Sequence, residues 1–540
     1  MNFGVPVDGC PTFEVTIPNQ GTLTGFTLKN PQNGNHTVHR FAKVPYALLS
    51  EERYSLPKSI PETFDYTGEY KFFGLKCPQP VYESKQLKYP KSPSDEYIQY
   101  SNIWVPSSNK YKPKNGWPVL IYIHGGWLQF GNPNNDFYDT VELMDDENFT
   151  DKYIFVTIGY RLNIFGFLTC SELIKENSKN TNMGFWDQRE AIKWVHKYIK
   201  YFGGDPEKIT LGGLSAGSYS TFFQLAYEAY NPNEQQIIKQ VVLNSNMIFS
   251  QPKSIAECED QYKEVINKLG INHLNSKDQL AKLRSYSYEF IEEFLPKLEL
   301  HTFRAVTDNH FINSSILKDI QSGEFSKLLT KKNIRILHGE VDNEGYLYSL
   351  LDPPISFDDL ATQIENYYPK QIVPILLKTY KVKEKIDLES SNVMKQFANL
   401  FGQIISDGQV YCSTRGFINN LIKNGFPVKS YFRYRISYRG KWMDKYLEPQ
   451  LKVTHGFDKA VWFYTLRAGF TNDEKSNLEI FLKPYFDFLN FKEYIKDWDT
   501  SDAKKIRWFK DNGSISYEDD PDWKWGIEVA DKVYKVQLEN

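Results

Sequence analysis

A series of short, continuous apolar runs, most of them followed by a turn that contains glycine, constrains the fold of this chain more than any other feature. The runs cover residues 119–123, 153–158, 209–211, 241–243, 334–337 and 431–434. Runs of this length suit strands that are buried on both faces, as in a parallel sheet. Helical patterns lie between them, for example in residues 187–201. The alternation predicts an α/β fold with a mostly parallel central sheet and helices on both of its faces.

The rest of the chain is predicted to surround this sheet within a single domain, residues 1–540. Residues 13–106 are richer in threonine, valine and turn residues, and indicate an antiparallel edge. Two mostly helical segments, about 254–330 and 356–424, interrupt the series of strands. Because pockets are usually built at the carboxyl edge of an α/β sheet, we expect these insertions to form a cap over one site.

The composition excludes several classes of protein. The 540 residues include 64 Lys+Arg and 67 Asp+Glu, which gives a net charge of −3, and aromatic residues make up 16%. A disordered chain would have fewer aromatic residues, and a nucleic-acid-binding protein would need a basic excess. The two uncharged stretches of membrane length, 115–135 and 209–227, are interrupted by glycine, serine and asparagine, so no transmembrane segment is predicted.

The cysteines indicate a reducing compartment. Cys10, Cys77, Cys170, Cys258 and Cys412 are scattered, and no CxxC or Cys/His cluster suggests a metal site, so neither a metal nor another cofactor is expected. The N-terminus has no basic segment followed by an apolar run, and no signal peptide is therefore predicted. We expect a cytoplasmic protein, and the sequence leaves its oligomeric state open.

A glycine-flanked serine is the clearest candidate for a catalytic group. The segment Gly213-Leu-Ser215-Ala-Gly217 follows the run at 209–211 and precedes a helical pattern, which is the strand–turn–helix order of a nucleophile elbow. Glycine allows such a turn to be tight. The helix that begins near Ala216 would direct its N-terminal N–H groups toward an oxyanion.

A second glycine-containing turn, His124-Gly-Gly-Trp127, directly follows the run at 119–123. Consecutive glycines allow backbone N–H groups to face a cavity, as an oxyanion hole requires. Alone this is only a turn at the end of a strand. Together with the elbow it predicts one serine hydrolase site.

Such a site also needs a base and an acid that orients the base. Of the nine histidines, only His455 lies beyond position 338, so the chain order of nucleophile, acid and histidine leaves one natural candidate for the base. The acid is expected just after the run at 334–337, where Glu340, Asp342 and Glu344 compete. The pattern alone does not choose among them.

A series of further motifs extends in order through most of the chain. They are Val44-Pro-Tyr-Ala47, Arg53-Tyr54, Cys77-Pro-Gln79, residues 95–106, Gly159-Tyr-Arg-Leu162, residues 182–188, Trp194-Val-His, residues 202–206, residues 339–345 and His455-Gly-Phe-Asp458. With the two glycine turns, these motifs resemble the type-B carboxylesterases, the carboxylesterase/cholinesterase family of α/β-hydrolases. The resemblance covers about residues 14–465 and is weak beyond them. It implies the α/β-hydrolase fold.

The resemblance also implies catalytic roles. Ser215 matches the family's nucleophile and His455 its base. The family's Glu-Gly dipeptide selects Glu344 as the acid. The backbone N–H groups of Gly126, Trp127 and Ala216 match the donors of its oxyanion hole.

Four more residues match supporting positions of the family. Ser245 matches a serine near the triad, and Asp458 matches an acid that packs behind the histidine loop. Arg53 and Glu96 match a buried structural salt bridge.

The chain also departs from the family. Leu214 replaces the usual Glu before the nucleophile, and residues 78–97 contain no Trp to hold a quaternary ammonium group, with Lys88 near the matching place. A cholinesterase is therefore not expected. Trp127 replaces the third glycine of the oxyanion turn; its N–H can donate if its φ is compatible, and its indole would crowd the acyl side. Ile98 replaces the family's cysteine partner of Cys77, which supports a reducing location.

We therefore predict a serine hydrolase that cleaves small-molecule carboxylic esters through an acyl-enzyme intermediate. Alternatives are a catalytically silent, cholinesterase-like binding protein or, with the same triad, a lipase, lactonase or amidase. His196 and His338 are expected to be structural because neither has a metal-ligand partner at helical spacing. The aromatic-rich tail, residues 498–525, is expected to pack onto the domain.

Overall fold

The computed structural model describes residues 3–50, 52–82 and 93–539. In this part of the chain, thirteen strands form one sheet, and two shorter two-stranded sheets lie beside it. The order in the large sheet is β1-β2-β3-β7-β9-β8-β10-β11-β14-β15-β16-β17, with β6 beside β2. Its strands are β1 (Thr12–Ile17), β2 (Gly21–Lys29), β3 (His36–Pro45), β6 (Gly68–Glu69), β7 (Tyr100–Pro106), β8 (Trp117–Ile123), β9 (Ile154–Ile158), β10 (Gly204–Leu214), β11 (Gln240–Asn244), β14 (Arg335–Val341), β15 (Tyr431–Ile436), β16 (Lys505–Phe509) and β17 (Ile515–Asp519).

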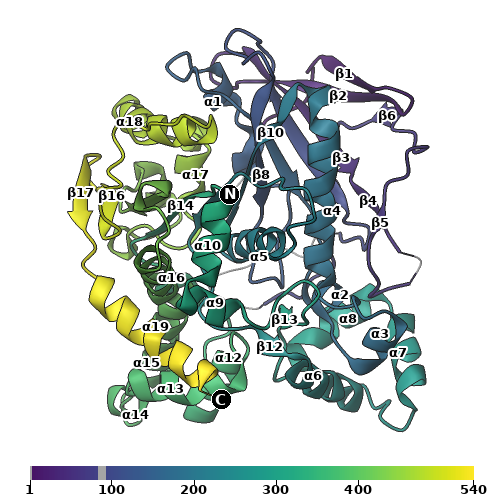
Figure 1. The fold of residues 1–540 in the computed structure, drawn as a ribbon, viewed down its shortest axis with the longest axis vertical. Coiled ribbons are helices and arrows are strands. Elements are labelled where there is room, and N and C mark those ends of the chain that lie inside the picture. Colours follow the sequence, from purple (N-terminus) through teal and green to yellow (C-terminus); the bar gives the residue numbers. More distant parts are fainter. Residues whose placement is uncertain (1–2, 51, 83–92, 540) are drawn as a thin grey trace.

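The centre of the sheet is parallel and its two ends are antiparallel. Every neighbouring pair from β9 through β16 is parallel. The pairs from β1 through β9 and the β16–β17 pair are antiparallel. The predicted parallel centre and antiparallel N-terminal edge are confirmed. The tail contributes more than packing, because β16 and β17 extend the sheet at the edge opposite the N-terminal strands (Figure 1).

Strand β8 shows why the apolar runs are continuous. All seven of its residues are buried. Val119, Ile121 and Ile123 belong to a core on one face of the sheet, whereas Leu120 and Tyr122 belong to the core on the other face. Since side chains alternate along a strand, a strand covered on both faces must be apolar throughout.

Helices cover both faces. The first core includes residues of α4 (Met183–Tyr198) and α5 (Ala216–Tyr230), and the second includes residues of α18 (Asn472–Leu489). The helix predicted over 187–201 begins at Met183 and ends in a 3-10 turn over Ile199–Phe202. The remaining helices outside the insertions are α1 (Val141–Asp145), α2 (Asn163–Phe167), α3 (Ser171–Glu176), α11 (Gly345–Tyr348), α17 (Lys459–Trp462) and α19 (Trp523–Leu538).

The two insertions are helical, as their patterns predict. The first contains α6 (Ile255–Lys268), α7 (Ser276–Ser285), α8 (Tyr288–Phe294), α9 (Ile316–Ser322) and α10 (Glu324–Lys331). The second contains α12 (Phe357–Glu365), α13 (Val373–Thr379), α14 (Val382–Lys385), α15 (Val393–Ser406) and α16 (Cys412–Lys423). Helices α6 to α8 lie at the lower right of the molecule in Figure 1, and helices α12 to α15 lie at the lower left. A third apolar core, which includes Trp127 and Tyr367, ties the second insertion to the turn after β8.

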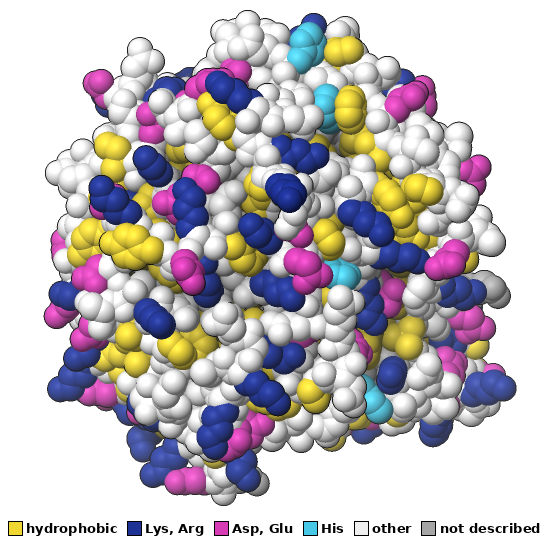
Figure 2. All heavy atoms as spheres, turned by 45° about the horizontal axis from the view of Figure 1, so that its top comes forward, with side chains coloured by type: hydrophobic (Ala, Val, Ile, Leu, Met, Phe, Trp, Pro, Cys, Tyr) yellow, Lys and Arg dark blue, Asp and Glu magenta, His cyan; other side chains and the backbone are white. Residues whose placement is uncertain are grey.

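The surface carries charges of both signs. On the face shown in Figure 2, basic and acidic side chains alternate without a large field of either sign, in keeping with the small net charge. Among the helices of the described residues, none combines the length and apolarity needed to cross a membrane. The same residues contain no cluster of three or more His, Cys, Asp or Glu side chains that could hold a metal ion.

Candidate active site

Ser215 lies on a strained turn between β10 and α5. Strand β10 ends at Leu214, α5 begins at Ala216, and Ser215 between them has φ 58° and ψ −123°. The glycines on either side permit this turn. A Cβ on Gly213 would lie 2.4 Å from the carbonyl carbon of Gly217, and one on Gly217 would lie 1.9 Å from Ile123 O. The observed geometry is that of a nucleophile elbow.

His455 and Glu344 lie in direct contact although they are far apart in sequence. The Nδ1 atom of His455 is 2.5 Å from Oε2 of Glu344. The other carboxylate oxygen accepts hydrogen bonds from Ser245 Oγ at 2.7 Å and from Val341 N at 2.9 Å. The carboxylate is fully buried and its orientation is fixed from three sides.

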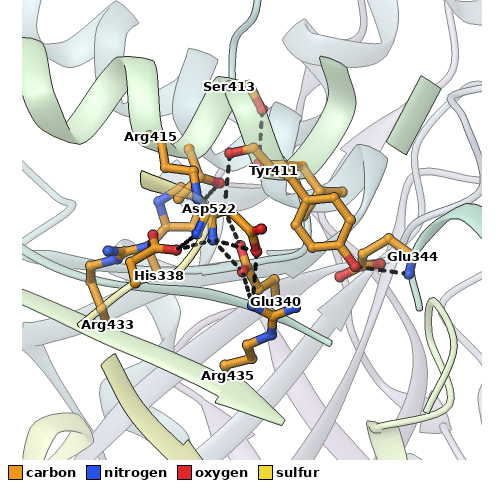
Figure 3. A network of polar contacts seen from close by, with 12 residues as sticks. His338, Glu340, Glu344, Tyr411, Ser413, Arg415, Arg433, Arg435 and Asp522 are labelled. Atoms are coloured by element: carbon orange, nitrogen blue, oxygen red, sulfur yellow. Dashed lines mark hydrogen bonds and ion pairs between the residues drawn. The ribbon is translucent and has the colours of Figure 1, made fainter. Parts of the chain in front are cut away.

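The other two candidate acids bind arginines instead of His455. Both oxygens of Glu340 accept hydrogen bonds from Arg415 at 2.7 Å, and both side chains are buried (Figure 3). Asp342 contacts Arg435, with 3.2 Å between Oδ1 and Nε. These contacts leave Glu344 as the acid that faces the histidine.

The arginine pairs form a network behind the acid. Arg415 also binds Asp520, and Asp520 binds Arg433 at 2.6 Å. The Tyr411 hydroxyl links this region to the Glu344 turn, since it accepts a hydrogen bond from Glu344 N at 3.2 Å and lies 2.9 Å from Val341 O (Figure 3). Tyr411 ends a π-helical turn, Asp407–Tyr411, between α15 and α16.

The other side of the imidazole ring faces Tyr348. His455 Nε2 is buried and has no hydrogen-bond partner among the described residues. The ring of Tyr348 lies 5.1 Å from the imidazole, and its hydroxyl interacts with that of Ser215. Burial and, after it, the nearby Glu344 carboxylate raise the pKa of Tyr348 well above its usual value, so the phenol stays protonated. A serine–histidine hydrogen bond is often absent from a ligand-free site and forms with substrate.

The turn after β8 presents unpaired N–H groups. Gly126 has φ 115°, and a Cβ there would lie 1.9 Å from Phe130 O, so only glycine fits. Trp127 has φ 64°, a left-handed conformation that costs a non-glycine residue about 1 kcal/mol or more. The N–H groups of Gly126, Trp127 and Ala216 donate to no acceptor in the part of the chain that the structure describes.

The indole of Trp127 packs into the cap. It stacks on Tyr367 with 4.6 Å between ring centroids and lies 5.6 Å from Tyr82. Its Nε1 atom is buried without an acceptor among the described residues. The side chain therefore joins the oxyanion turn to the inserted helices.

The supporting residues Asp458, Arg53 and Glu96 differ in how deeply they are buried. Asp458 is buried and accepts a hydrogen bond from Trp462 Nε1 at 2.8 Å, and burial raises the pKa of its carboxyl to about 6. Arg53 binds Glu96, with 2.8 Å from Nε to Oε2, but these side chains are 15% and 25% exposed rather than buried. They line a cavity of about 740 Å³ to which no residue of the candidate triad contributes.

Three side chains near the site were not predicted from the sequence. Tyr348 lies one helical turn after Glu344, and Lys459 lies one turn after His455, so i+4 spacing from each candidate was the available signal. If Gly456 carried a Cβ, this atom would lie 3.8 Å from Lys459 Nζ and 3.6 Å from Leu214 Cδ2, so both side chains lie beside the histidine loop. Arg304, which contacts Trp127, had no such signal.

The remaining sequence predictions concern residues outside the site. His338 is buried between Tyr431 and Thr414, and His196 contacts Gln235 on the surface. All five cysteines are free thiols, and Cys77 is buried. Lys88 lies outside the described residues.

Comparison with known proteins tests the resemblance. The model of the carboxylesterase family matches residues 11–510. The chain belongs to the carboxylesterase family. An uncharacterized esterase/lipase of Schizosaccharomyces pombe is 40% identical over 97% of each chain, and a carboxylic ester hydrolase of Gibberella moniliformis is 33% identical over 94% of this chain and 93% of its own. The solved structure of a PNB esterase matches with a TM-score of 0.71 and 22% identity, over 96% of this chain and 99% of that one, which supports the fold.

Membership in this family confirms the predicted enzyme class. The protein is a carboxylic ester hydrolase with an α/β fold, and its substrates are esters. The family match also extends about 45 residues beyond the end of the resemblance found in the sequence, into β16.

Proposed function

We propose that this carboxylesterase works by acyl transfer to Ser215, with His455 as the base and Glu344 as the acid. The observation that supports this most strongly is the contact of 2.5 Å between His455 Nδ1 and a buried Glu344 carboxylate, together with Tyr348, which contacts both His455 and the Ser215 hydroxyl. The carboxylate fixes the imidazole tautomer and leaves Nε2 free to accept a proton.

In the first half of the reaction, Ser215 Oγ attacks the ester carbonyl carbon while His455 Nε2 accepts the hydroxyl proton. The negative charge that develops on the carbonyl oxygen is stabilised by the N–H groups of Gly126, Trp127 and Ala216, each donor lowering the barrier by about 2.7–4 kcal/mol. The bond to the alcohol oxygen then breaks, and His455 returns the proton to the leaving alcohol. In the second half, water activated by His455 cleaves the acyl-enzyme.

The surroundings of the serine argue against a cholinesterase. Leu214 supplies no negative charge, and Lys459 is a cation close to the histidine loop. Burial lowers the pKa of Lys459, while the neighbouring Asp458 opposes that shift. A positively charged alcohol group would be repelled here, so we propose neutral or anionic esters as substrates.

Hydrolysis of a series of p-nitrophenyl esters from acetate to palmitate tests this function. Wild type is expected to hydrolyse part of the series, and Ser215→Ala is expected to fold normally and to be inactive. Activity that persists in Ser215→Ala would contradict the assignment of the nucleophile. No activity of the wild type on any ester would favour the silent binding protein, and a preference for long chains at an interface would favour a lipase.

A further inference from the structure

Two basic side chains are buried side by side next to the oxyanion turn. Lys253 and Arg304 are 8% and 9% exposed. The short parallel strands β12 (Lys253–Ser254) and β13 (Val306–Thr307) bring their segments together, with Lys253 opposite Val306. Neither cation forms an ion pair within the described residues. Glu257 and Glu365 oppose the lowering of the Lys253 pKa by burial, but both act from beyond ion-pair distance.

Arg304 is tied to the catalytic elements on two sides. Its Nη1 donates to Trp127 O at 3.2 Å, and the N–H of the same residue is a proposed oxyanion donor. Its guanidinium carbon lies 5.5 Å from the ring of Tyr219 and 5.6 Å from that of Tyr367. Tyr219 is on α5, where its N–H donates to Ser215 O at 3.0 Å. Arg304 therefore contacts both the oxyanion turn and the first turn of the helix that follows Ser215.

The two cations line one small cavity. Its other walls include Tyr219, Phe249, Tyr367 and Gln409, and it offers about 20 Å³ to the centre of a water molecule. About 10–15 Å³ on this measure is enough for one water, so the cavity has room for a small group but not for a whole substrate, and no residue of the candidate triad lines it.

Other buried arginines in this protein have their charge paired with an acid or donate to several backbone carbonyls, although Nε and Nη1 of Arg189 and Nε of Arg415 have no acceptor among the described residues. Arg189 binds Glu228 and Arg415 binds Glu340, with all four side chains about 1% exposed or less. Arg507, without an acid, donates to three backbone carbonyls. Arg304 has five N–H donors, and the acceptors that the structure describes for them are Trp127 O and the Tyr219 hydroxyl. An uncompensated buried charge is unfavourable by several kcal/mol, and an anion in the cavity would offset that cost.

We propose that Arg304 and Lys253 form an anion subsite that binds a carboxylate carried by the ester substrate. The natural substrate is then an ester with a negatively charged group at one end, such as a half-ester of a dicarboxylic acid. This inference rests on the proposed function, because the subsite adjoins the turn that holds the oxyanion.

Matched ester pairs test the subsite. Monoethyl succinate is compared with ethyl butyrate for a carboxylate on the acyl side, and 3-acetoxypropionate with propyl acetate for one on the alcohol side, so that within each pair a carboxylate replaces a methyl group. The ratio of kcat/KM for the anionic and neutral ester is measured in wild type, Arg304→Gln and Lys253→Gln. Because a hydrogen bond to a charged group contributes about 1.5–3 kcal/mol, Arg304→Gln is expected to lower this ratio about 10- to 150-fold for one pair, mainly through KM.

Arg335→Gln is the matched control. Arg335 is partly buried at the start of β14, where it stacks on Phe432 and Phe488, and it contacts no residue of the cavity. This variant should keep the wild-type ratio. Equal ratios in wild type and Arg304→Gln for both pairs would overturn the subsite while ethyl butyrate hydrolysis still supports the serine esterase. Loss of all hydrolysis in wild type would instead contradict the proposed function.

Discussion

The environments of Glu340 and Glu344 predict opposite effects for the same chemical change. Glu344 faces His455. Glu340 neutralises Arg415 in the buried network (Figure 3). Replacing each carboxylate by an amide keeps the size of the side chain and removes its charge. We therefore expect Glu344→Gln to impair catalysis and Glu340→Gln to impair stability.

The magnitudes follow from these contacts. An amide at position 344 cannot stabilise the imidazolium and favours the wrong tautomer; in a serine protease triad the analogous change lowers kcat by about 10⁴, or about 5 kcal/mol of barrier. An amide at position 340 leaves Arg415 with Asp520 as its remaining fully buried acid. Breaking a buried ion pair destabilises a fold by about 3–5 kcal/mol.

Two assays separate the effects. The value of kcat/KM for p-nitrophenyl butyrate reports catalysis, and urea unfolding followed by circular dichroism reports the free energy of unfolding. Asp342 lies in the same loop but contacts Arg435 instead of His455. Asp342→Asn is therefore the control and should change kcat/KM by less than about tenfold. A stable Glu340→Gln that is nearly inactive, beside an active Glu344→Gln, would refute this assignment of the acid.

Three further predictions use other contacts. Trp127→Gly removes a buried indole from its stack on Tyr367 but relieves a positive φ, so it should destabilise the fold by about 3 kcal/mol. It should also shift the preference among p-nitrophenyl esters toward longer acyl chains. An unchanged preference would show that the acyl group does not bind beside Trp127. Burial raises the pKa of Asp407 from 3.8 to about 6. The protonated carboxyl therefore contributes fully to the free energy of unfolding below pH 3.8, and this contribution is lost as the pH rises through about 6. Asp407→Asn should therefore remove about 2 kcal/mol of the fall in unfolding free energy between pH 4 and pH 7, and equal slopes in both proteins would contradict the buried carboxyl. Lys459→Met should raise the rate of acetylthiocholine hydrolysis relative to that of its uncharged dimethylbutyl analogue by roughly tenfold, because about 1–2 kcal/mol of charge repulsion is lost. No change in this ratio would show that Lys459 does not lie near the alcohol group of the substrate.

The sequence predicted those parts of the fold that leave a periodic signal. The continuous apolar runs identified the parallel strands because burial on both faces forces every position to be apolar. Strands β16 and β17 were missed because Lys505–Phe509 and Ile515–Asp519 contain no continuous apolar run: β16 includes the buried Arg507, and β17, at the edge of the sheet, ends in Glu518 and the exposed Asp519. Their charged and aromatic composition resembles that of a packed tail.

The candidate site also contains some residues that the sequence could predict and others that it could not. Ser215 and the glycine turns have local signatures, since backbone conformation requires glycine there. The choice of Glu344 over Glu340 and Asp342 depends on Arg415 and Arg435, which contact these acids only in the folded chain. The buried cation at Arg304 likewise has no local pattern. The cytoplasmic location stays a prediction.

Covalent labelling tests the central claim most directly. A fluorophosphonate, which reacts with activated serines, is incubated with the native enzyme, and the labelled peptide is identified by mass spectrometry. Ser218→Ala is the matched control, because Ser218 lies on the same helix but donates to Asn246 O. We predict one phosphonyl group per chain, on Ser215, with loss of esterase activity in proportion to labelling and no labelling of Ser215→Ala. Full inactivation with the label on another serine, or full activity after Ser215 is labelled, would contradict the account.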